Sequence, residues 1–266
     1  MADNAPIFER EVLEIRRARA AAKHEDYSFL QTLAREQIRD RLDDIRRDFQ
    51  VIKDVQHDDF KGELEALGLE AGSLDLITSV LNLHSTNDLP GALAQMKAAL
   101  KPDGLFMAAM FGGETLHELR ASLMHAEMAL KGGASPRVFP FADKQQMGGL
   151  LQRAGFALPV VDSDIITVTY ENMFKLMHDL RGMGESNIIA ARSRVNPGKA
   201  FFMKAAEYYQ QHFTGRDGRI EASFEIIYLL GWAPHESQQQ PLRPGSAQNR
   251  LADALQTDEI KMGERP

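Results

Sequence analysis

The sequence predicts an α/β fold built on a mixed sheet flanked by helices, and three segments lead to this prediction. Residues 74–83 and 105–111 are apolar runs that are too short for buried helices and have the composition of buried strands. The segment 89–100 between them carries apolar residues at helical spacing. Two apolar strands joined by a helix indicate a right-handed crossover, so we expect a buried parallel pair.

Local signals mark the limits of this helix. Asn87 or Asp88 is suited to accept hydrogen bonds from the first helical amides, and Pro90 lies close to the first turn, where a missing N–H is harmless. The sequence Lys-Pro-Asp-Gly at 101–104 ends the helix, because proline cannot continue it and glycine tolerates the turn. The second strand is expected directly after this turn.

The composition excludes several classes of protein. Of the 266 residues, 44% are hydrophobic, which is enough for a substantial core, and 26% are charged, which is ordinary for a soluble protein. The net charge of −7 argues against nucleic acid as the main partner. The absence of cysteine excludes disulfides, thiolate metal sites and thiol nucleophiles. No apolar run has the length of a membrane span and the N-terminus lacks the apolar core of a signal peptide, so we expect a cytoplasmic protein.

The N-terminal segment 1–48 is predicted to be helical, with amphipathic stretches over 5–24 and 27–48. Residues 51–55 contain β-branched residues and fit a short strand, and three glycines interrupt the segment that follows, up to residue 72. This region is therefore expected to contain little regular structure.

Two polar clusters in this part of the chain each have a functional and a structural interpretation. Arg16, Arg17 and Arg19 fit contact with a phosphate or an acidic partner, but a solvated helix face is favoured. His57 and the two aspartates after it are metal-ligand types, but adjacent residues do not converge on one point. A solvated turn is favoured over a metal site, and no metal is predicted.

The remaining chain continues the alternation of helices and strands. Helical spacing predicts four further helices, over 115–130, 143–154, 173–180 and 197–212. Extended patterns predict two further strands, over 159–170 and 222–232. An α/β domain is thus expected over 49–233, and a poorly ordered tail over 234–266, where Gln, Pro, Gly and charged residues dominate.

Several motifs carry a resemblance to known proteins. Leu-Lys-Pro-Asp-Gly at 100–104 resembles the junction of a helix and strand 5 in class I S-adenosylmethionine-dependent methyltransferases, and Leu-Leu-Gln-Arg-Ala-Gly-Phe at 150–156 resembles the helix before strand 6. Four more specific motifs together resemble the mitochondrial complex I assembly factor 5 family and its bacterial relatives. They are Asn-Asp-Leu-Pro at 87–90, Phe-Gly-Gly-Glu-Thr-Leu at 111–116, Gly-Met-Gly-Glu-Ser-Asn at 182–187, and Gly-Trp at 231–232 with His-Glu-Ser at 235–237.

This resemblance implies a Rossmann-like class I methyltransferase fold of the type 11 kind, with S-adenosylmethionine as the cofactor. It also implies a protein substrate, because the mitochondrial branch is tied to assembly of respiratory complex I and to hydroxylation of an arginine on one of its subunits. The carboxyl methyltransferase of biotin synthesis is among the related class I enzymes.

One part of the family's fold has no counterpart in the sequence. In the family, the segment before strand 4 holds strand 1, a Gly-rich turn of the form Asp-x-Gly-x-Gly, two helices and strands 2 and 3. Here only residues 48–72 are available, and a single βαβ unit needs about 30 residues. The only Gly-x-Gly, at 182–184, follows a helix, where a helix C-cap is favoured over a cofactor loop. We therefore expect a partial fold that lacks its first βα units, with no strand beside residues 74–83.

The resemblance also implies candidate site residues. His84 fits either a general base or a hydrogen-bonded loop histidine. The candidates on the cofactor side, around the adenine and at the carboxyl end of the strand at 74–83, are Glu63, Leu64, Ser79, Asn82 and His84. The candidates on the substrate side are Gly112, Gly113, Glu114, Glu185, Ser186, Asn187, Trp232, His235 and Glu236.

Three hypotheses for the function follow. The first is a transferase or modifying enzyme that uses S-adenosylmethionine. The second is a non-catalytic relative that acts as a binding or assembly factor, since methyl transfer depends on alignment of the donor and the cofactor cradle is missing. The third is an internally deleted chain that folds poorly, because the strand at 74–83 has lost its neighbour.

Overall fold

The structure is a computed structural model, and it describes residues 5–62 and 65–239. The chain divides into two compact units, 1–234 and 235–266. The N-terminal helices belong to the same unit as the sheet. Most of the predicted tail, from residue 240 onward, lies outside the described residues.

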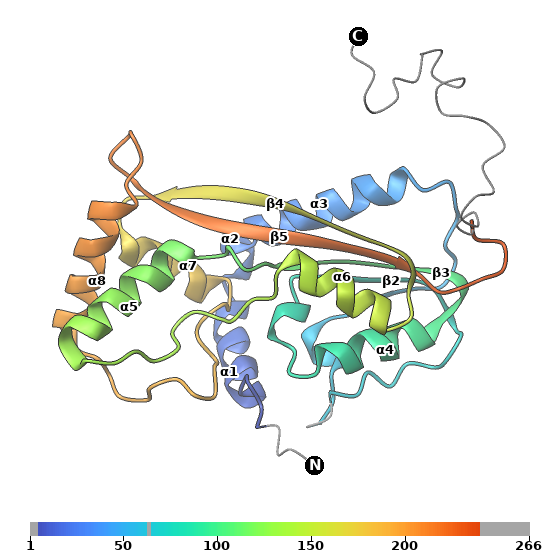
Figure 1. Cartoon of the computed structure of the whole chain (residues 1–266), viewed down its shortest axis with the longest axis horizontal. Helices are drawn as coiled ribbons and strands as arrows, with labels where there is room; N and C mark the ends of the chain where they lie inside the picture. The colour runs from blue at the N-terminus through green and yellow to red at the C-terminus, as the bar shows by residue number, and fades with distance from the viewer. Residues whose placement is uncertain (1–4, 63–64, 240–266) are drawn as a thin grey trace, which may run out of the picture. The chain divides into compact units, whose positions relative to one another are not determined.

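A five-stranded mixed sheet forms the centre of the first unit, with the strand order β1-β2-β3-β5-β4 (Figure 1). The pairs β1–β2 and β2–β3 are parallel, whereas β5 runs antiparallel to both β3 and β4. The prediction of an α/β fold with a mixed sheet is confirmed. The strands are β1 (Ile52–Asp54), β2 (Leu74–Val80), β3 (Leu100–Phe111), β4 (Ala157–Tyr170) and β5 (Ile220–Trp232).

Helices cover both faces of the sheet. The predicted helices are present. The first one begins at Arg10 instead of residue 5, and the second one ends at Asp43 instead of residue 48. The α-helices are α1 (Arg10–Ala21), α2 (His24–Tyr27), α3 (Phe29–Asp43), α4 (Leu89–Ala99), α5 (His117–Lys131), α6 (Lys144–Arg153), α7 (Met173–Gly182) and α8 (Lys199–His212). Two short 3-10 helices follow β1 and β2, namely η1 (His57–Asp59) and η2 (Leu83–Ser85).

The side chains of β3 alternate between two hydrophobic cores. Leu105, Met107 and Ala109 pack into the core that includes residues of α3, α5, α7 and α8. Phe106 and Ala108 pack into the core on the other face, with α4 and α6. Because both faces are covered, the strand is a continuous apolar run instead of an alternating one. Burial of each large apolar side chain stabilises the fold by roughly 1.5–3 kcal/mol.

A strand lies beside β2, which differs from the prediction. β1 pairs in parallel with β2, with Ile52 opposite Leu76 and Asp54 opposite Thr78, so β2 is an inner strand. The expectation that β2 has no neighbour is therefore wrong, and with it the reason to expect poor folding. The first βα units are nevertheless missing, because the described residues between β1 and β2 form only η1 and no α-helix.

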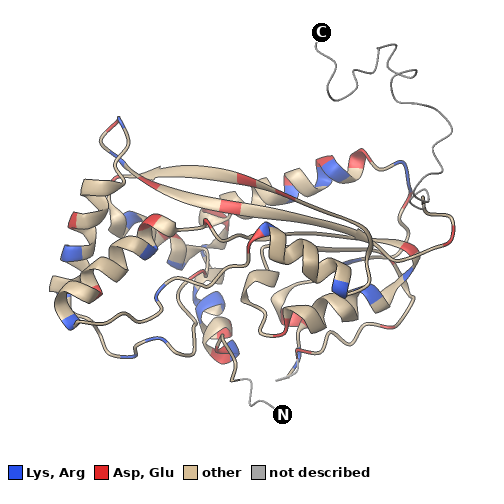
Figure 2. Cartoon of the chain, viewed as in Figure 1, with Lys and Arg blue, Asp and Glu red and all other residues tan. Residues whose placement is uncertain are grey.

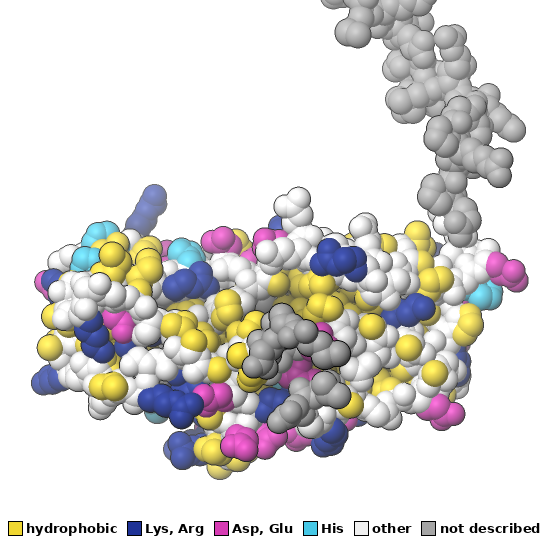
Figure 3. All heavy atoms as spheres, turned by 60° about the horizontal axis from the view of Figure 1, so that its bottom comes forward, with side chains coloured by type: hydrophobic (Ala, Val, Ile, Leu, Met, Phe, Trp, Pro, Cys, Tyr) yellow, Lys and Arg dark blue, Asp and Glu magenta, His cyan; other side chains and the backbone are white. Residues whose placement is uncertain are grey.

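Charged residues are spread over the helices and loops, and the central strands carry few of them (Figure 2). On the face shown in Figure 3, hydrophobic side chains lie among acidic and basic ones. Within the described ranges, no helix has the length and apolar composition needed to cross a bilayer. The outer strands of the sheet are β1 at one edge and β4 at the other.

Candidate functional site

The carboxyl end of β2 turns sharply into η2. Leu81 has a φ of 51°, and its amide donates to the carbonyl of Ala109 at 2.8 Å. A left-handed conformation costs a non-glycine residue about 1–2 kcal/mol, and such strain is concentrated at functional sites. The turn places Asn82 and His84 at the end of the parallel pair β2–β3, where open α/β sheets bind their ligands.

A buried polar cluster crosses this end of the sheet. His84 Nε2 lies 3.0 Å from Glu185 Oε2, and Arg17 donates to Glu185 Oε1 at 3.5 Å and to Asn82 Oδ1 at 3.3 Å. Burial acts to raise the pKa of Glu185, but the charges and hydrogen bonds of His84 and Arg17 outweigh it and hold the pKa below its ordinary value. Glu185 is therefore an ionised carboxylate shared by α1, the β2 turn and the end of α7.

The end of α7 explains why Glu185 lies here. The helix ends at Gly182, and Gly184 has a φ of 82°, which lets the amide of Glu185 turn back and donate to the carbonyl of Leu180 at 2.8 Å. A side chain at Gly182 would come within 2.3 Å of the Tyr27 ring. The Gly-Met-Gly sequence is thus a helix C-cap, the interpretation that the sequence favoured.

His84 is enclosed by aromatic rings. Its ring centroid lies 4.9 Å from that of Phe111, 5.9 Å from Phe141 and 6.1 Å from Phe139, and the side chain is fully buried. Nδ1 has no hydrogen-bond partner among the described residues. His84 is thus a hydrogen-bonded loop histidine, and its catalytic role stays a prediction.

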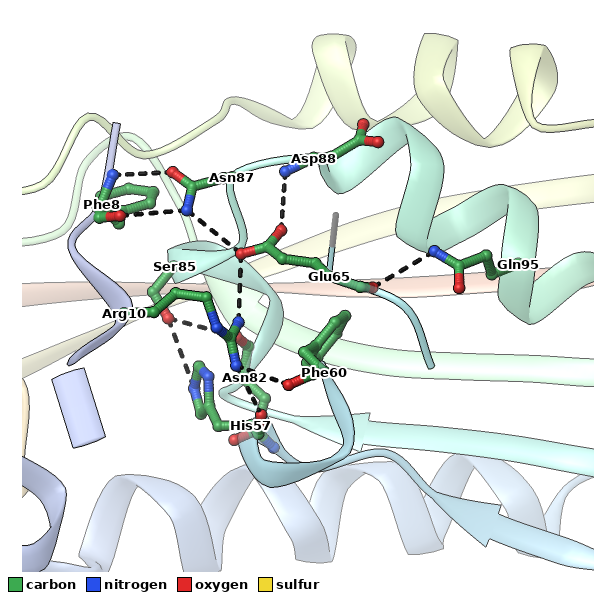
Figure 4. Close-up of polar contacts among 10 residues, drawn as sticks. All are labelled: Phe8, Arg10, His57, Phe60, Glu65, Asn82, Ser85, Asn87, Asp88 and Gln95. Atoms are coloured by element: carbon green, nitrogen blue, oxygen red, sulfur yellow. Dashed lines mark hydrogen bonds and ion pairs between the residues drawn. The ribbon is translucent and has the colours of Figure 1, made fainter. Parts of the chain in front are cut away.

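A second polar network fastens α1 to the same region (Figure 4). Glu65 is only 1% exposed and accepts from Arg10 Nη1 at 3.2 Å, Asn87 Nδ2 at 3.3 Å and the amide of Asp88 at 2.9 Å. Arg10 also donates to the carbonyl of His57 at 3.2 Å. These contacts join α1, η1 and the start of α4.

Two cavities border this cluster. The larger one, of about 610 Å³, lies among α1, α2, α3 and the turn after β1. The smaller one, of about 320 Å³, lies among α5, α7, α8 and the ends of β3 and β5. Phe111 and Glu185 line both cavities, so the two spaces share a wall. Polar residues that line the larger cavity include Arg10, Arg17, His24, Gln56, His57 and Asp58.

The structure brings some of the predicted site residues together. Glu185, Ser186 and Asn187 line the smaller cavity. Ser79, Asn82 and His84 lie at the carboxyl end of β2 but are not among the described residues that line either cavity, and the Ser79 hydroxyl donates to the carbonyl of Val55 at 2.9 Å. Glu63 and Leu64 lie outside the described residues.

The first residues of the loop after β3, Gly112 to Glu114, are tied to β5 and are not among the described residues that line either cavity. The amide of Gly112 donates to the carbonyl of Glu225 at 2.9 Å, and the amide of Glu114 donates to Glu225 Oε2 at 3.0 Å. The side chain of Glu114 is exposed, and a Cβ at Gly113 would meet no atom within 4 Å. A structural role therefore accounts for Gly112.

Trp232 lies at the far end of β3 from the polar cluster. It pairs with Leu105, near the start of β3, whereas the cluster lies near Phe111 at the other end of that strand, because β5 runs antiparallel to β3. The substrate-side role of Trp232 stays a prediction. His235 and Glu236 belong to the second unit, where both are exposed.

Two structural interpretations of polar residues also need correction. Arg17 was expected on a solvated helix face, but its guanidinium reaches Glu185 and Asn82. His57 was expected in a solvated turn, but it is buried in η1, although Asp58 is exposed. No group of three potential metal-ligating side chains occurs in the described part of the chain.

These features define a methyltransferase-like α/β protein, and comparison with known proteins agrees. A family profile described as a methyltransferase domain matches residues 12–159. Since the match covers more than half of the chain, the chain belongs to the methyltransferase-domain family.

Individual proteins within this family are similar to the chain. The chain is 36% identical over 299 positions to "Arginine-hydroxylase NDUFAF5, mitochondrial" of Mus musculus, covering 97% of this chain and 87% of that protein. It is 48% identical to the protein of the same name from Dictyostelium discoideum, over 70% of this chain and 43% of that protein. It is 38% identical to the malonyl-[acyl-carrier protein] O-methyltransferase of Nitrosospira multiformis, over 65% of this chain and 54% of that protein. The match thus spans about half of the latter two relatives.

Two conclusions follow from these relatives. The mouse alignment has 299 positions although this chain has 266 residues, so the mouse protein carries residues without a counterpart here. The predicted cytoplasmic location is wrong, because the arginine-hydroxylase relatives are named as mitochondrial proteins.

The turn after β1 lies where a glycine turn would have to contact S-adenosylmethionine if this chain bound it in the way expected for the family. A glycine turn allows close approach of the backbone to a cofactor. Here the turn contains Gln56 and His57, and the Gln56 amide is engaged by Asp59 Oδ2 at 2.8 Å while its side-chain oxygen accepts from Asn82 at 3.3 Å. Side chains occupy the turn, so the described residues do not fit the cofactor in this way.

Gly112→Ala is expected to lower the free energy of unfolding by about 2 kcal/mol, because the new Cβ would lie 2.5 Å from Glu225 Oε2 and overpack the site. Gly113→Ala is the matched control and should change stability by less than about 0.5 kcal/mol. Urea unfolding followed by circular dichroism measures both. Equal effects of the two substitutions would contradict the role assigned to Gly112.

The stability of the chain should fall in mild acid because of His57. Burial, together with the charges of Arg17, His84 and Arg10, lowers the pKa of His57 well below its ordinary value. The unfolded chain therefore takes up a proton that the folded chain does not. Stability is complete above the unfolded pKa of about 6.5 and is lost as the pH falls below it, by up to about 1.4 kcal/mol per pH unit.

In the wild type, the free energy of unfolding should be lower at pH 5.5 than at pH 7.5. In His57→Gln this difference should shrink by roughly the free energy gained when the unfolded chain binds one proton at His57. Replacement of the exposed His235 by Gln is the control and should leave the difference unchanged. Urea unfolding at the two pH values measures the effect. A pH dependence that survives in His57→Gln would show that His57 is not its cause.

Proposed function

We propose that this chain acts in the assembly of respiratory complex I by binding a segment of a partner protein at the carboxyl ends of β2 and β3. The family and the arginine-hydroxylase relatives support this proposal. The single observation that carries it is the pair of cavities with a common wall at Phe111 and Glu185. Such a pair provides one space for an inserted side chain and a second one beside it.

The residues around the wall have distinct tasks in this proposal. Phe111, Phe139 and Phe141 exclude water from the inner side of the smaller cavity. Glu185 is held ionised by His84 and Arg17, so it stays in a fixed position when a partner binds. Its interactions with His84 and Arg17 offset the free energy of desolvating this carboxylate before any partner protein binds.

Modification of the bound partner with S-adenosylmethionine is the second candidate function. The methyltransferase-domain match favours it, and so does Arg17 Nε, which borders the larger cavity and is buried without a hydrogen-bond partner among the described residues. When bound, this cofactor supplies a methyl group. The turn after β1 argues against it, and the arginine-hydroxylase relatives widen the possible chemistry to hydroxylation.

Calorimetric titration with S-adenosylmethionine separates the two candidates. We expect no binding at micromolar concentration, because the turn after β1 lacks the backbone approach that the cofactor needs. Micromolar binding that is lost in Arg17→Gln would favour the second candidate and contradict the conclusion that the turn after β1 does not fit the cofactor. The exposed Arg153 provides the control substitution Arg153→Gln, which should leave any binding unchanged.

Cells that lack this protein should contain less assembled complex I, as measured on native gels. Wild-type chain and Arg153→Gln are expected to restore the complex. Glu185→Gln is expected to fail at equal cellular abundance, because a neutral amide cannot hold both His84 and Arg17. Normal assembly in the cells that lack the protein would refute the proposed function.

A further inference from the structure

The smaller cavity combines an apolar wall with guanidinium groups. Aromatic and aliphatic side chains from β3, β5, α5 and α8 form the wall, among them Phe224, Leu123 and Phe202. Arg16 of α1, Arg181 of α7 and Arg137 from the loop before α6 also line it. The three arginines differ in how they are partnered, and this difference determines what the cavity binds.

Arg137 is neutralised within the fold. Its Nε and Nη2 donate to the two carboxylate oxygens of Glu127 at 3.1 and 2.8 Å. The hydrogen bonds from Arg137 are the main cause that lowers the pKa of Glu127 to about 2, so the pair stays ionised. Arg137 therefore has little charge to offer to a ligand.

Arg16 and Arg181 form no ion pair with a carboxylate of the described chain. Arg16 donates to the main-chain carbonyl of Asn187 and forms no ion pair among the described residues. The side chain of Arg181 is exposed and makes no hydrogen bond or ion pair within the described ranges. Burial, followed by the like charges of Arg192 and Arg19, lowers the pKa of Arg16 below its ordinary value, although Glu9 opposes the shift.

The carboxylate in the wall does not balance this charge. Glu185 is already engaged by His84 and Arg17. A half-buried guanidinium beside apolar surface is stabilised by an anion, and planar guanidinium groups match carboxylates in geometry. The cavity therefore has an apolar interior and an unbalanced positive charge.

We propose that the smaller cavity binds a group that combines an apolar chain with a terminal carboxylate, held by Arg16 and Arg181. The proposal rests on the proposed function in that the same cavity receives the inserted group of the partner. The proposed group is negatively charged. It therefore differs from an arginine side chain, which is the substrate that the name of the relatives indicates.

Three probes of equal chain length test this proposal by calorimetry on the full chain. Octanoate carries a carboxylate, octanol is neutral and octylguanidinium is cationic. Octanoate is expected to bind at least about tenfold more tightly than either of the others, since charge-assisted hydrogen bonds contribute more than neutral ones. Its affinity should weaken as salt is added, whereas that of octanol should not.

Substitutions locate the site. Arg181→Gln and Arg16→Gln should each weaken octanoate binding by about five- to tenfold and leave octanol within about twofold. Arg181 is exposed, so its variant tests the charge even if Arg16→Gln disturbs the contact with Asn187. Arg153→Gln is the matched control and should bind octanoate as the wild type does. Leu123→Phe, which fills the cavity, should weaken all three probes.

Several results would overturn the proposal. They are equal binding of octanoate and octanol, tighter binding of octylguanidinium, no effect of either arginine substitution, or unchanged binding in Leu123→Phe. Tighter octylguanidinium binding would not contradict the proposed function, but it would show that the cavity prefers a cationic, arginine-like group. Failure of the proposed function shows separately, as normal complex I assembly in cells that lack the protein.

Discussion

The ionised carboxylate of Glu185 is the constraint on which this end of the molecule depends. A buried charge is tolerated only when it is paired, and removing one partner of such a pair costs about 3–5 kcal/mol. Its partners come from α1 and from the turn after β2, while its own position is set by the glycine cap of α7. Three segments that are distant in sequence are thereby held at one point, between two cavities.

The short strand β1 shows how the sheet persists without the family's first βα units. Three residues in parallel register cover the edge of β2, and the side chains of Val55 and Phe60 continue the hydrophobic core beneath it. The turn that follows is filled by side chains instead of glycine. The fold thus keeps β2, β3, β4 and β5 in one sheet, while only β1, η1 and the turn between them stand where the family has its first βα units.

Much of the fold was predictable because its signals are local. The Asp88 cap and the apolar periods depend on neighbours within a few residues, and they located most helices and strands, although the predicted turn at 101–104 lies inside β3. The site was less predictable, since Arg17 and Glu185 are 168 residues apart and neither carries a local signal of the contact. The distance of Trp232 from this cluster was unpredictable for a related reason, because a strand's sequence does not contain its direction in the sheet.

The distant contacts of α1 also determine when the site can form during synthesis. Arg10 bonds to Glu65, Arg17 bonds to Glu185, and Glu9 pairs with Arg192 and Arg194. Contacts over such separations form late, because the intervening chain must first be brought together. On the ribosome, α1 emerges before α7 and has no complete binding surface until α7 and the segment after it have been made. The first helix of the chain is thus among the last to dock.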